Sequence, residues 1–283
     1  MRSPLTICLL ALLFLTPDRP LSADWKDSLT PDTPGPFPHL RPFDAEYRIG
    51  WTGIEAARAH VKISGDAGGN ARFSGTCATC GLARALWQLD ASLNSTSAID
   101  GFKPICSVQN ENYESYSILT QIVSRPDGIW CHRENFPPRG NPARWKRIKI
   151  SPLRDLFSGA LFIRSQSLAP GARVSTVIFP GDCPFLVEIS DVAACKIKVD
   201  GAVRDSLKFD IKLQRINLKL GVRLEKYGKF HSGTIWLSND ADRIPLRVEI
   251  NVFVGFIFAE LQSIRFTRPG AQFPRHPPTS ISK

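Results

Sequence analysis

The chain has 283 residues, of which 43% are hydrophobic, and it carries a formal net charge of +10. This length and hydrophobic content suffice for a substantial core, arranged as one large β domain or as two smaller domains. After the first 23 residues no segment is long and charge-free enough to cross a bilayer, which excludes a later membrane-spanning helix.

The N-terminal residues 1–23 have the pattern of a secretory signal peptide. Arg2 provides the positive start, residues 7–15 form an apolar block, and Ala23 offers a small residue for cleavage. The block is shorter than the ~20 apolar residues of a membrane-spanning helix, although the prolines that follow it leave an uncleaved anchor open. We therefore expect an exported protein of the periplasm or cell envelope.

Two proline-rich segments flank the rest of the chain. Residues 24–42 predict an extended linker, because closely spaced prolines cannot build the interior of a sheet or helix. Residues 267–283 lack apolar periodicity and predict a disordered, basic, proline-rich tail. The folded domain is therefore expected over residues 43–266.

Short runs of alternating apolar and polar residues recur through this domain. Residues 43–51 and 57–63 predict a first hairpin around Thr52-Gly53. Turn formers separate the further runs, which are 71–77, 89–97, 105–110, 115–124, 128–133, 145–150, 173–179, 185–190, 194–199, 206–213 and 218–224. The pattern predicts a mainly β protein, with a long antiparallel meander that forms a curved half-barrel or barrel-like sheet.

Two stretches interrupt this rhythm and predict helices. Residues 81–89 favour a short helix, and residues 151–167 favour a stronger one with a single apolar face. Asp155 suits the start of the second helix, and Pro170-Gly171 suits its end. We expect one or two short helices on the concave side of the sheet.

The last part of the domain, residues 233–261, predicts a closing hairpin. Two alternating strands flank the polar turn 239–243, and a third, more apolar strand follows.

Three motifs carry a family resemblance. They are Tyr47-x-x-x-Trp51-x-Gly53, the segment from Asp155 to Arg164, and Ile235-Trp-Leu-Ser-Asn-Asp-Ala-Asp-Arg-Ile-Pro-Leu-Arg247. With Gly255 and Glu260-Leu261 they resemble the bacterial envelope family called domain of unknown function 3108, over residues 43–266. The resemblance implies an exported, mostly antiparallel β protein, similar to the half-barrel lipid and lipoprotein carriers of the periplasm. It implies no catalytic residue.

Six cysteines follow the signal peptide, and this number departs from the usual family pattern. An even count in an exported chain favours structural disulfides, with fifteen pairings open. Cys77 and Cys80 also form a Cys-x-x-Cys motif, but no second close pair completes a zinc site and no βαβ context supports a redox centre. We therefore predict a structural role without metal or cofactor for Cys77, Cys80, Cys106, Cys131, Cys183 and Cys195.

Arg164 and Arg243 are the most prominent candidates for ligand binding. The resemblance places both in motif segments, and a guanidinium can hold a carboxylate, a phosphate or several carbonyls. One interpretation is structural, with Arg164 bridging to Asp155, Asp240 or Asp242 and joining helix to sheet. The other is recognition of a ligand headgroup. Trp51 and Trp236 become further ligand contacts if the sheet encloses a cavity.

Catalysis has weaker support. Asp240 and Asp242 form a carboxylate pair that a hydrolase-type enzyme would use, but both lie in a turn where such residues bond to the backbone and where Arg243 offers a charge partner. An enzyme would also need His231 or Cys77 to approach this pair. We therefore expect a protein that is not an enzyme.

Two functions remain in view. The first is binding of a lipid or another apolar ligand in the curved sheet, and the second is a structural or protein-interaction module of the envelope with a filled core. Basic patches at 139–154 and 219–229 favour peripheral contact with anionic membrane components over nucleic acid if the chain is exported, and a solvated basic face without a partner is an equal alternative. The oligomeric state stays open.

Overall fold

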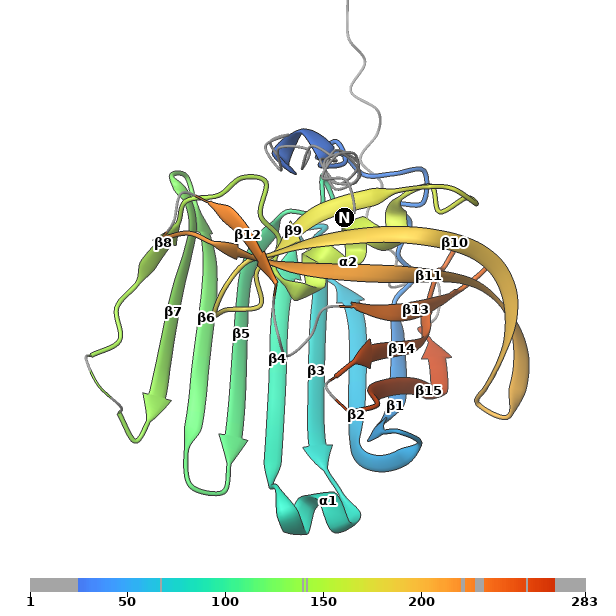
Figure 1. Cartoon of the computed structure of the whole chain (residues 1–283), viewed down its shortest axis with the longest axis horizontal. Coiled ribbons are helices and arrows are strands. Elements are labelled where there is room, and N and C mark those ends of the chain that lie inside the picture. The colour runs from blue at the N-terminus through green and yellow to red at the C-terminus, as the bar shows by residue number, and fades with distance from the viewer. Residues whose placement is uncertain are drawn as a thin grey trace, which may run out of the picture.

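A computed structural model describes residues 25–66, 68–138, 140, 142–219, 222–226, 232–252 and 254–267 (Figure 1). The predicted signal peptide and the tail beyond residue 267 lie outside these residues.

Fifteen strands of the described residues form one antiparallel sheet. Its order is β8-β7-β6-β5-β4-β3-β2-β1-β15-β14-β13-β11-β10-β9, with β12 paired to β11. The last strand therefore returns to the first, while β8 and β9 form two separate ends and leave the sheet open. The strands are β1 (Phe43–Trp51), β2 (Ile54–Gly65), β3 (Ala71–Thr79), β4 (Leu89–Ser97), β5 (Pro104–Tyr113), β6 (Ser117–Arg125), β7 (Gly128–Phe136), β8 (Lys146–Ile148), β9 (Val174–Ile178), β10 (Phe185–Val199), β11 (Ala202–Asn217), β12 (Arg223–Lys226), β13 (Ser232–Ser238), β14 (Pro245–Asn251) and β15 (Phe256–Phe266). The predicted mainly β, barrel-like antiparallel meander is confirmed.

The first hairpin follows the sequence pattern closely. Thr52 and Gly53 form its two-residue turn with φ angles of 47° and 89°, the left-handed conformation that such a turn requires. Because side chains alternate along a strand, Tyr47 and Ile49 face the inside of the sheet while Arg48 faces outward.

The hairpin of β10 and β11 differs from the predicted pair of short runs. Residues 185–190 and 194–199 belong to one strand of 15 residues, which is interrupted by a register shift between Ser190 and Ala193. Asp191 has a φ of 54° at this bulge. A bulge bends its strand, and the hairpin curves strongly around one side of the molecule (Figure 1).

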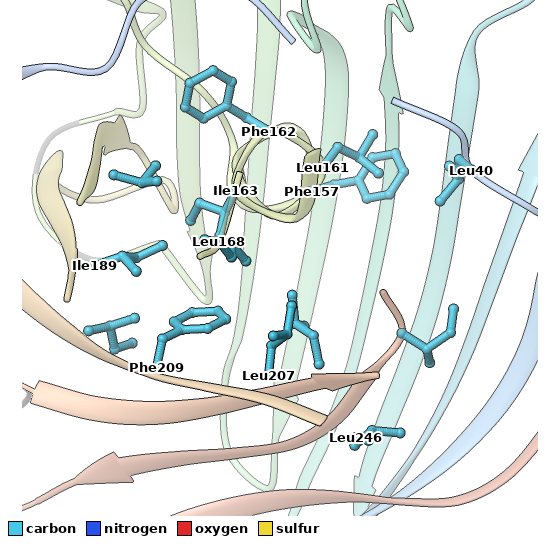
Figure 2. Close-up of a cluster of buried hydrophobic side chains, with 14 of the residues drawn as sticks. Leu40, Phe157, Leu161, Phe162, Ile163, Leu168, Ile189, Leu207, Phe209 and Leu246 are labelled. Carbon is cyan, nitrogen blue, oxygen red and sulfur yellow. The ribbon is translucent and has the colours of Figure 1, made fainter. Parts of the chain in front are cut away.

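Two α-helices and one short 3-10 helix, η1 (Trp25–Ser28), complete the described fold. Helix α2 (Leu156–Ser165) lies within the curve of the sheet, and Figure 2 shows its Leu161 and Ile163 in the same cluster as Phe209 of β11. Helix α1 (Gly81–Leu86) lies beyond the ends of β3 and β4 (Figure 1). Among the described residues, no helix is long and apolar enough to span a membrane.

The proline-rich segment before β1 is extended, and it packs on the domain. The backbone N–H of Thr30 donates to the carbonyl of Ser175 at 3.0 Å, and that of Phe37 donates to Ser165 at 3.0 Å. Leu40 is buried in the main core. The segment therefore covers the C-terminal end of α2.

Candidate functional site

An apolar cavity of about 490 Å³ lies between the first strands, α2 and the strands from β10 to β15. Inward-facing residues of opposite sheet regions line it, including Val61 of β2, Phe73 of β3, Ile211 of β11 and Val248 of β14. The lining follows from the alternation of each strand, which puts every second residue on this face. Ligand sites in proteins span ~300–1,000 Å³, so the cavity has the size of a binding site.

Helix α2 forms one wall of the cavity. Its N-terminus is set by a capping box in which the Asp155 carboxylate accepts from the Ser158 backbone N–H at 2.7 Å, while the Ser158 hydroxyl accepts from the Asp155 N–H at 3.0 Å. Asp155 also accepts from the Ser95 hydroxyl of β4 at 2.5 Å. Burial raises the pKa of Asp155, and these hydrogen bonds oppose the rise. The predicted structural role of Asp155 is therefore a helix cap that is also tied to the sheet.

Tyr47 adds a polar group that the sequence did not single out as a ligand contact. Its side chain lines the cavity, and its hydroxyl donates to the carbonyl of Pro245 at 2.9 Å. Burial raises the pKa of Tyr47 far above its ordinary value, so the phenol stays neutral.

Arg164 and Arg243 lie together at the edge of the cavity. Nη2 of Arg164 donates to the carbonyls of His39 at 2.5 Å and Asp242 at 2.8 Å. Nη1 of Arg243 donates to the carbonyls of Arg164 at 3.1 Å and Gln166 at 2.5 Å, and its guanidinium lies 3.6 Å from the centre of the Phe37 ring. The arginines therefore join the end of α2 to the closing turn and to the N-terminal segment.

Of the predicted bridges from Arg164, the one to Asp242 is present, but it runs through the backbone carbonyl of Asp242 instead of the carboxylate. The Asp242 carboxylate pairs with Arg41 at 2.5 Å. The Asp240 carboxylate accepts from the Ser238 hydroxyl at 2.7 Å and from the backbone N–H of Asp242 and Arg243 at 3.0 Å. Asp240 thus stabilises the turn, as in an Asx-type turn, while Asp242 links the turn to Arg41 of the N-terminal segment. Arg243 points its side chain to the helix instead of serving as their charge partner.

The two tryptophans proposed as ligand contacts do not line the cavity. Trp51 lies at the end of β1, half-exposed, and its Nε1 donates to the carbonyl of Val254 at 2.7 Å. Trp236 pairs with Lys208 and Arg247 across neighbouring strands, while Ile235 beside it faces the cavity, so Trp236 projects from the opposite face of β13.

The predicted disulfides are absent, since all six cysteines are free thiols. The strand register places other residues opposite them: Cys77 pairs with Ala59 and Ala91, and Cys106 with Thr96 and Val123. The Cys131 thiol contacts the carbonyl of Gly181 at 3.4 Å, and the Cys195 sulfur lies 3.2 Å from the Ser206 hydroxyl. Burial raises the pKa of Cys131 and of Cys183 to about 11.

The two basic patches of the sequence meet in space. Ile148 and Ile150 share one hydrophobic cluster with Leu218 and Leu224, so the lysines and arginines beside them border the same edge of the sheet. Arg139 and Lys229, the outer ends of these patches, lie outside the described residues, as does His231. Within the described ranges, no group of three or more His, Cys, Asp or Glu side chains is placed to hold a metal ion.

Fold and cavity together define an open, barrel-like antiparallel β protein with an apolar cavity within the curve of its sheet. The model of the family described as "Protein of unknown function (DUF3108)" matches residues 46–262, so the chain belongs to this family. Among curated proteins, none matches the sequence.

Solved structures share the fold at low identity. A β-barrel-like protein of domain of unknown function DUF1849 from Brucella abortus is similar at 10% identity with a TM-score of 0.53, over 81% of this chain and 99% of that one. A protein of Bacteroides fragilis, described as a candidate exported protein with a YmcC-like fold, is 8% identical with a TM-score of 0.35 and covers 82% of this chain and 99% of its own. The fold assignment rests on the first of these structures, because its TM-score is the higher of the two.

Proposed function

We propose that this protein is a non-enzymatic, exported envelope protein that binds one apolar chain of a lipid in its internal cavity. The observation that carries the proposal is the cavity of about 490 Å³, whose lining is aliphatic and aromatic apart from Tyr47 and three charged residues at one edge. Hydrophobic transfer favours such binding by ~0.8 kcal/mol per buried methylene.

The cavity volume limits the size of the ligand. An engineered apolar cavity of ~150 Å³ takes up benzene, which has six carbon atoms. By proportion, a cavity of 490 Å³ accommodates about twenty carbon atoms, which is one acyl chain and not the two chains of a phospholipid.

Two further features support the proposal. The signal-peptide pattern of residues 1–23 directs the chain to a compartment where lipids are carried between membranes. Leu156, at the start of α2, lines the cavity and keeps 43% of its surface exposed, so other side chains do not cover this wall completely. The alternative, a structural module with a filled core, has no comparable observation in its favour.

A neutral probe tests the proposal. We expect 1-hexadecanol to bind the purified protein in a fluorescence displacement assay, and Ala259→Phe to weaken this binding at least tenfold, because Ala259 lines the cavity. Ala78→Phe is the matched control, since Ala78 is exposed on the opposite face of β3. Equal binding by both variants, or no binding by the wild type, would contradict the proposal.

A further inference from the structure

The guanidinium of Arg164 has donors that the protein does not use. Only 6% of the residue is exposed, and its Nη2 holds the carbonyls of His39 and Asp242. Its Nε and Nη1 are buried and have no partner, and the residue lines the apolar cavity. The structural role of Arg164 therefore accounts for the hydrogen bonds of only one of its three guanidinium nitrogens, Nη2.

The positive charge at this edge is also only partly compensated, by the nearby carboxylates of Asp242 and Asp240. Arg243 is 4% exposed, its Nε lacks a partner, and neither arginine forms a salt bridge with a described carboxylate. Burial and the neighbouring Arg243 lower the pKa of Arg164 to about 10, although the carboxylates of Asp242 and Asp240 oppose this shift. Two buried cations whose hydrogen bonds reach only neutral carbonyls are unfavourable, and a bound anion would reduce this penalty.

We infer that the ligand of the cavity is an anionic single-chain amphiphile, whose headgroup accepts a hydrogen bond from Nε or Nη1 of Arg164 while its chain lies among the apolar side chains. The inference rests on the proposed function and names its ligand class. A carboxylate fits, because an ionised oxygen accepts a stronger hydrogen bond from a guanidinium donor than a neutral hydroxyl does. A fatty acid of about sixteen carbons is within the volume estimated from the cavity.

The test compares palmitate with 1-hexadecanol, which has the same chain and no charge. We expect the wild type to bind palmitate about 10- to 100-fold more tightly, the range for a hydrogen bond to a charged group. Arg164→Gln should remove this preference, so that the affinity for palmitate falls to that for hexadecanol. Arg72→Gln is the control, because Arg72 lies largely exposed on β3.

The outcomes separate the two proposals. Equal affinity of the wild type for both probes would overturn the headgroup assignment and leave the apolar site standing. An equal loss of both probes in a folded Arg164→Gln protein would also overturn it, because the residue would then act only on the shape of the cavity. Failure of both probes to bind the wild type would reject the proposed function itself. If Arg164→Gln does not fold, two measurements still test the headgroup assignment. The wild type should prefer palmitate to hexadecanol, and Arg164→Lys, which keeps the charge, should retain part of this preference.

A different observation concerns the end of the sheet that holds α1. Leu82 and Leu86 of this helix are 85% and 88% exposed, and Ile54 in the neighbouring hairpin is 69% exposed. The Cys80 N–H donates to the carbonyl of Ala56 at 2.9 Å, so α1 begins beside the first hairpin (Figure 1). Large aliphatic side chains gathered on one exposed end are typical of an interaction surface.

The apolar lining of the cavity continues to this end. Ile49 of β1 pairs with Ala259 of β15, and both line the cavity. Two residues further along the same face, Trp51 pairs with Ile257, and both are exposed. A chain leaving the cavity along this face would therefore meet apolar side chains up to the exposed end.

The charge and the residue types of this exposed end indicate which kind of partner it binds. Glu55 pairs with Arg58 and Arg84 pairs with Asp90, so these ion pairs add no net charge. Trp51 and Trp87, both exposed, have the amphipathic rings that favour the boundary between lipid and water. We propose that the end formed by Trp51, Ile54, Leu82, Leu86 and Trp87 docks on a lipid bilayer.

Vesicle sedimentation tests this docking. We expect the full chain to bind phosphatidylcholine vesicles and Leu82→Ser with Leu86→Ser to reduce the bound fraction at least fivefold, with little dependence on salt. Val203→Ser is the control, because Val203 is 65% exposed on the β10–β11 hairpin. Three results would overturn the proposal: no binding by the wild type, self-association of the wild type that the double variant abolishes, or salt-sensitive binding that the double variant keeps. The last result would assign membrane contact to the basic patches at 139–154 and 219–229.

Discussion

The two halves of the sheet use the same antiparallel strands for different interiors. The half built from β1 to β3 and β10 to β15 faces α2 with apolar side chains and encloses the cavity. On the half from β4 to β7, Glu111 of β5 accepts from the Gln109 amide and the Tyr113 hydroxyl, each at 2.7 Å, and Arg133 donates to the Thr120 hydroxyl at 2.8 Å. Glu111 lies in the same cross-strand row as Ala91, Cys77 and Ala59, the last of which lines the cavity. Strand pairing thus sets the shape of both halves, while side-chain chemistry decides which half can receive an apolar ligand.

The largest effect on stability is expected in the half that lines the cavity. Phe209 is completely buried, belongs to the main core and lines the cavity. Phe209→Ala should lower the free energy of unfolding by ~3–5 kcal/mol, because it removes a large buried ring and enlarges a void. Urea unfolding followed by circular dichroism measures the change. Phe136→Ala, at an exposed end of β7, should cost far less, and similar losses in both variants would contradict the comparison.

A medium effect is expected where the two halves meet through α2. Asp155→Ala removes the helix cap and the bond from Ser95, and it should lower the free energy of unfolding by ~1–2 kcal/mol. A double-mutant cycle with Ser95→Ala isolates the link between helix and sheet. Strictly additive losses would mean that the Ser95 bond contributes nothing.

The contribution of Asp155 to stability should also depend on pH. Burial raises its pKa in the folded state, so the folded protein holds this proton to higher pH than the unfolded chain does. The contribution of the group to stability is therefore present below its unfolded pKa and declines as pH rises through the folded pKa. Asp155→Asn should flatten this part of the stability profile in unfolding experiments from acid to neutral pH.

A smaller effect on stability is expected in the half from β4 to β7. Glu111→Gln keeps the shape of the side chain and its acceptor oxygen but removes the charge beside Arg133, which lies 3.9 Å away. Since the pair is partly exposed, the loss should be ~1 kcal/mol or less, and binding of an apolar probe should not change. A clear loss of probe binding would show that the ligand extends into this half.

The thiols should have the smallest effect on stability. With six free cysteines, a reductant should leave the Tm unchanged, whereas disulfides would lower it on reduction. Cys131 and Cys183, whose pKa values are raised to about 11, should react slowly with iodoacetamide at neutral pH and faster as the pH approaches 11, because the thiolate is the reactive form. Mass spectrometry of the labelled peptides measures this directly.

Much of the architecture could be predicted because it depends on local patterns. The alternation of β1 and β2, the turn at Thr52-Gly53 and the capping signal at Asp155 each involve residues close in sequence, and all three are confirmed. The bulge in β10 escaped prediction, since an inserted residue breaks the alternation and resembles a gap between two strands.

The candidate site was predicted in part. Arg164 and Arg243 do lie together, but their partners are backbone carbonyls, which carry no signal in the sequence. The N-terminal segment was interpreted as a linker from its prolines, although Phe37 and Leu40 were the apolar residues that indicated contact with the domain. For cysteines within strands, such as Cys77 and Cys106, the absence of a disulfide follows from strand register, which the count of cysteines does not contain.

The sequence by itself determined the antiparallel meander, its closing hairpin and the helix against its concave side, because hydrophobic periodicity, turn residues and capping act over a few residues. Only the tertiary structure decided that the half lining the cavity is hollow and that two buried arginines with unused hydrogen-bond donors lie at its edge. A cavity is volume that side chains from distant strands fail to fill, so it depends on the curvature of the whole sheet and on the distance at which α2 packs against it.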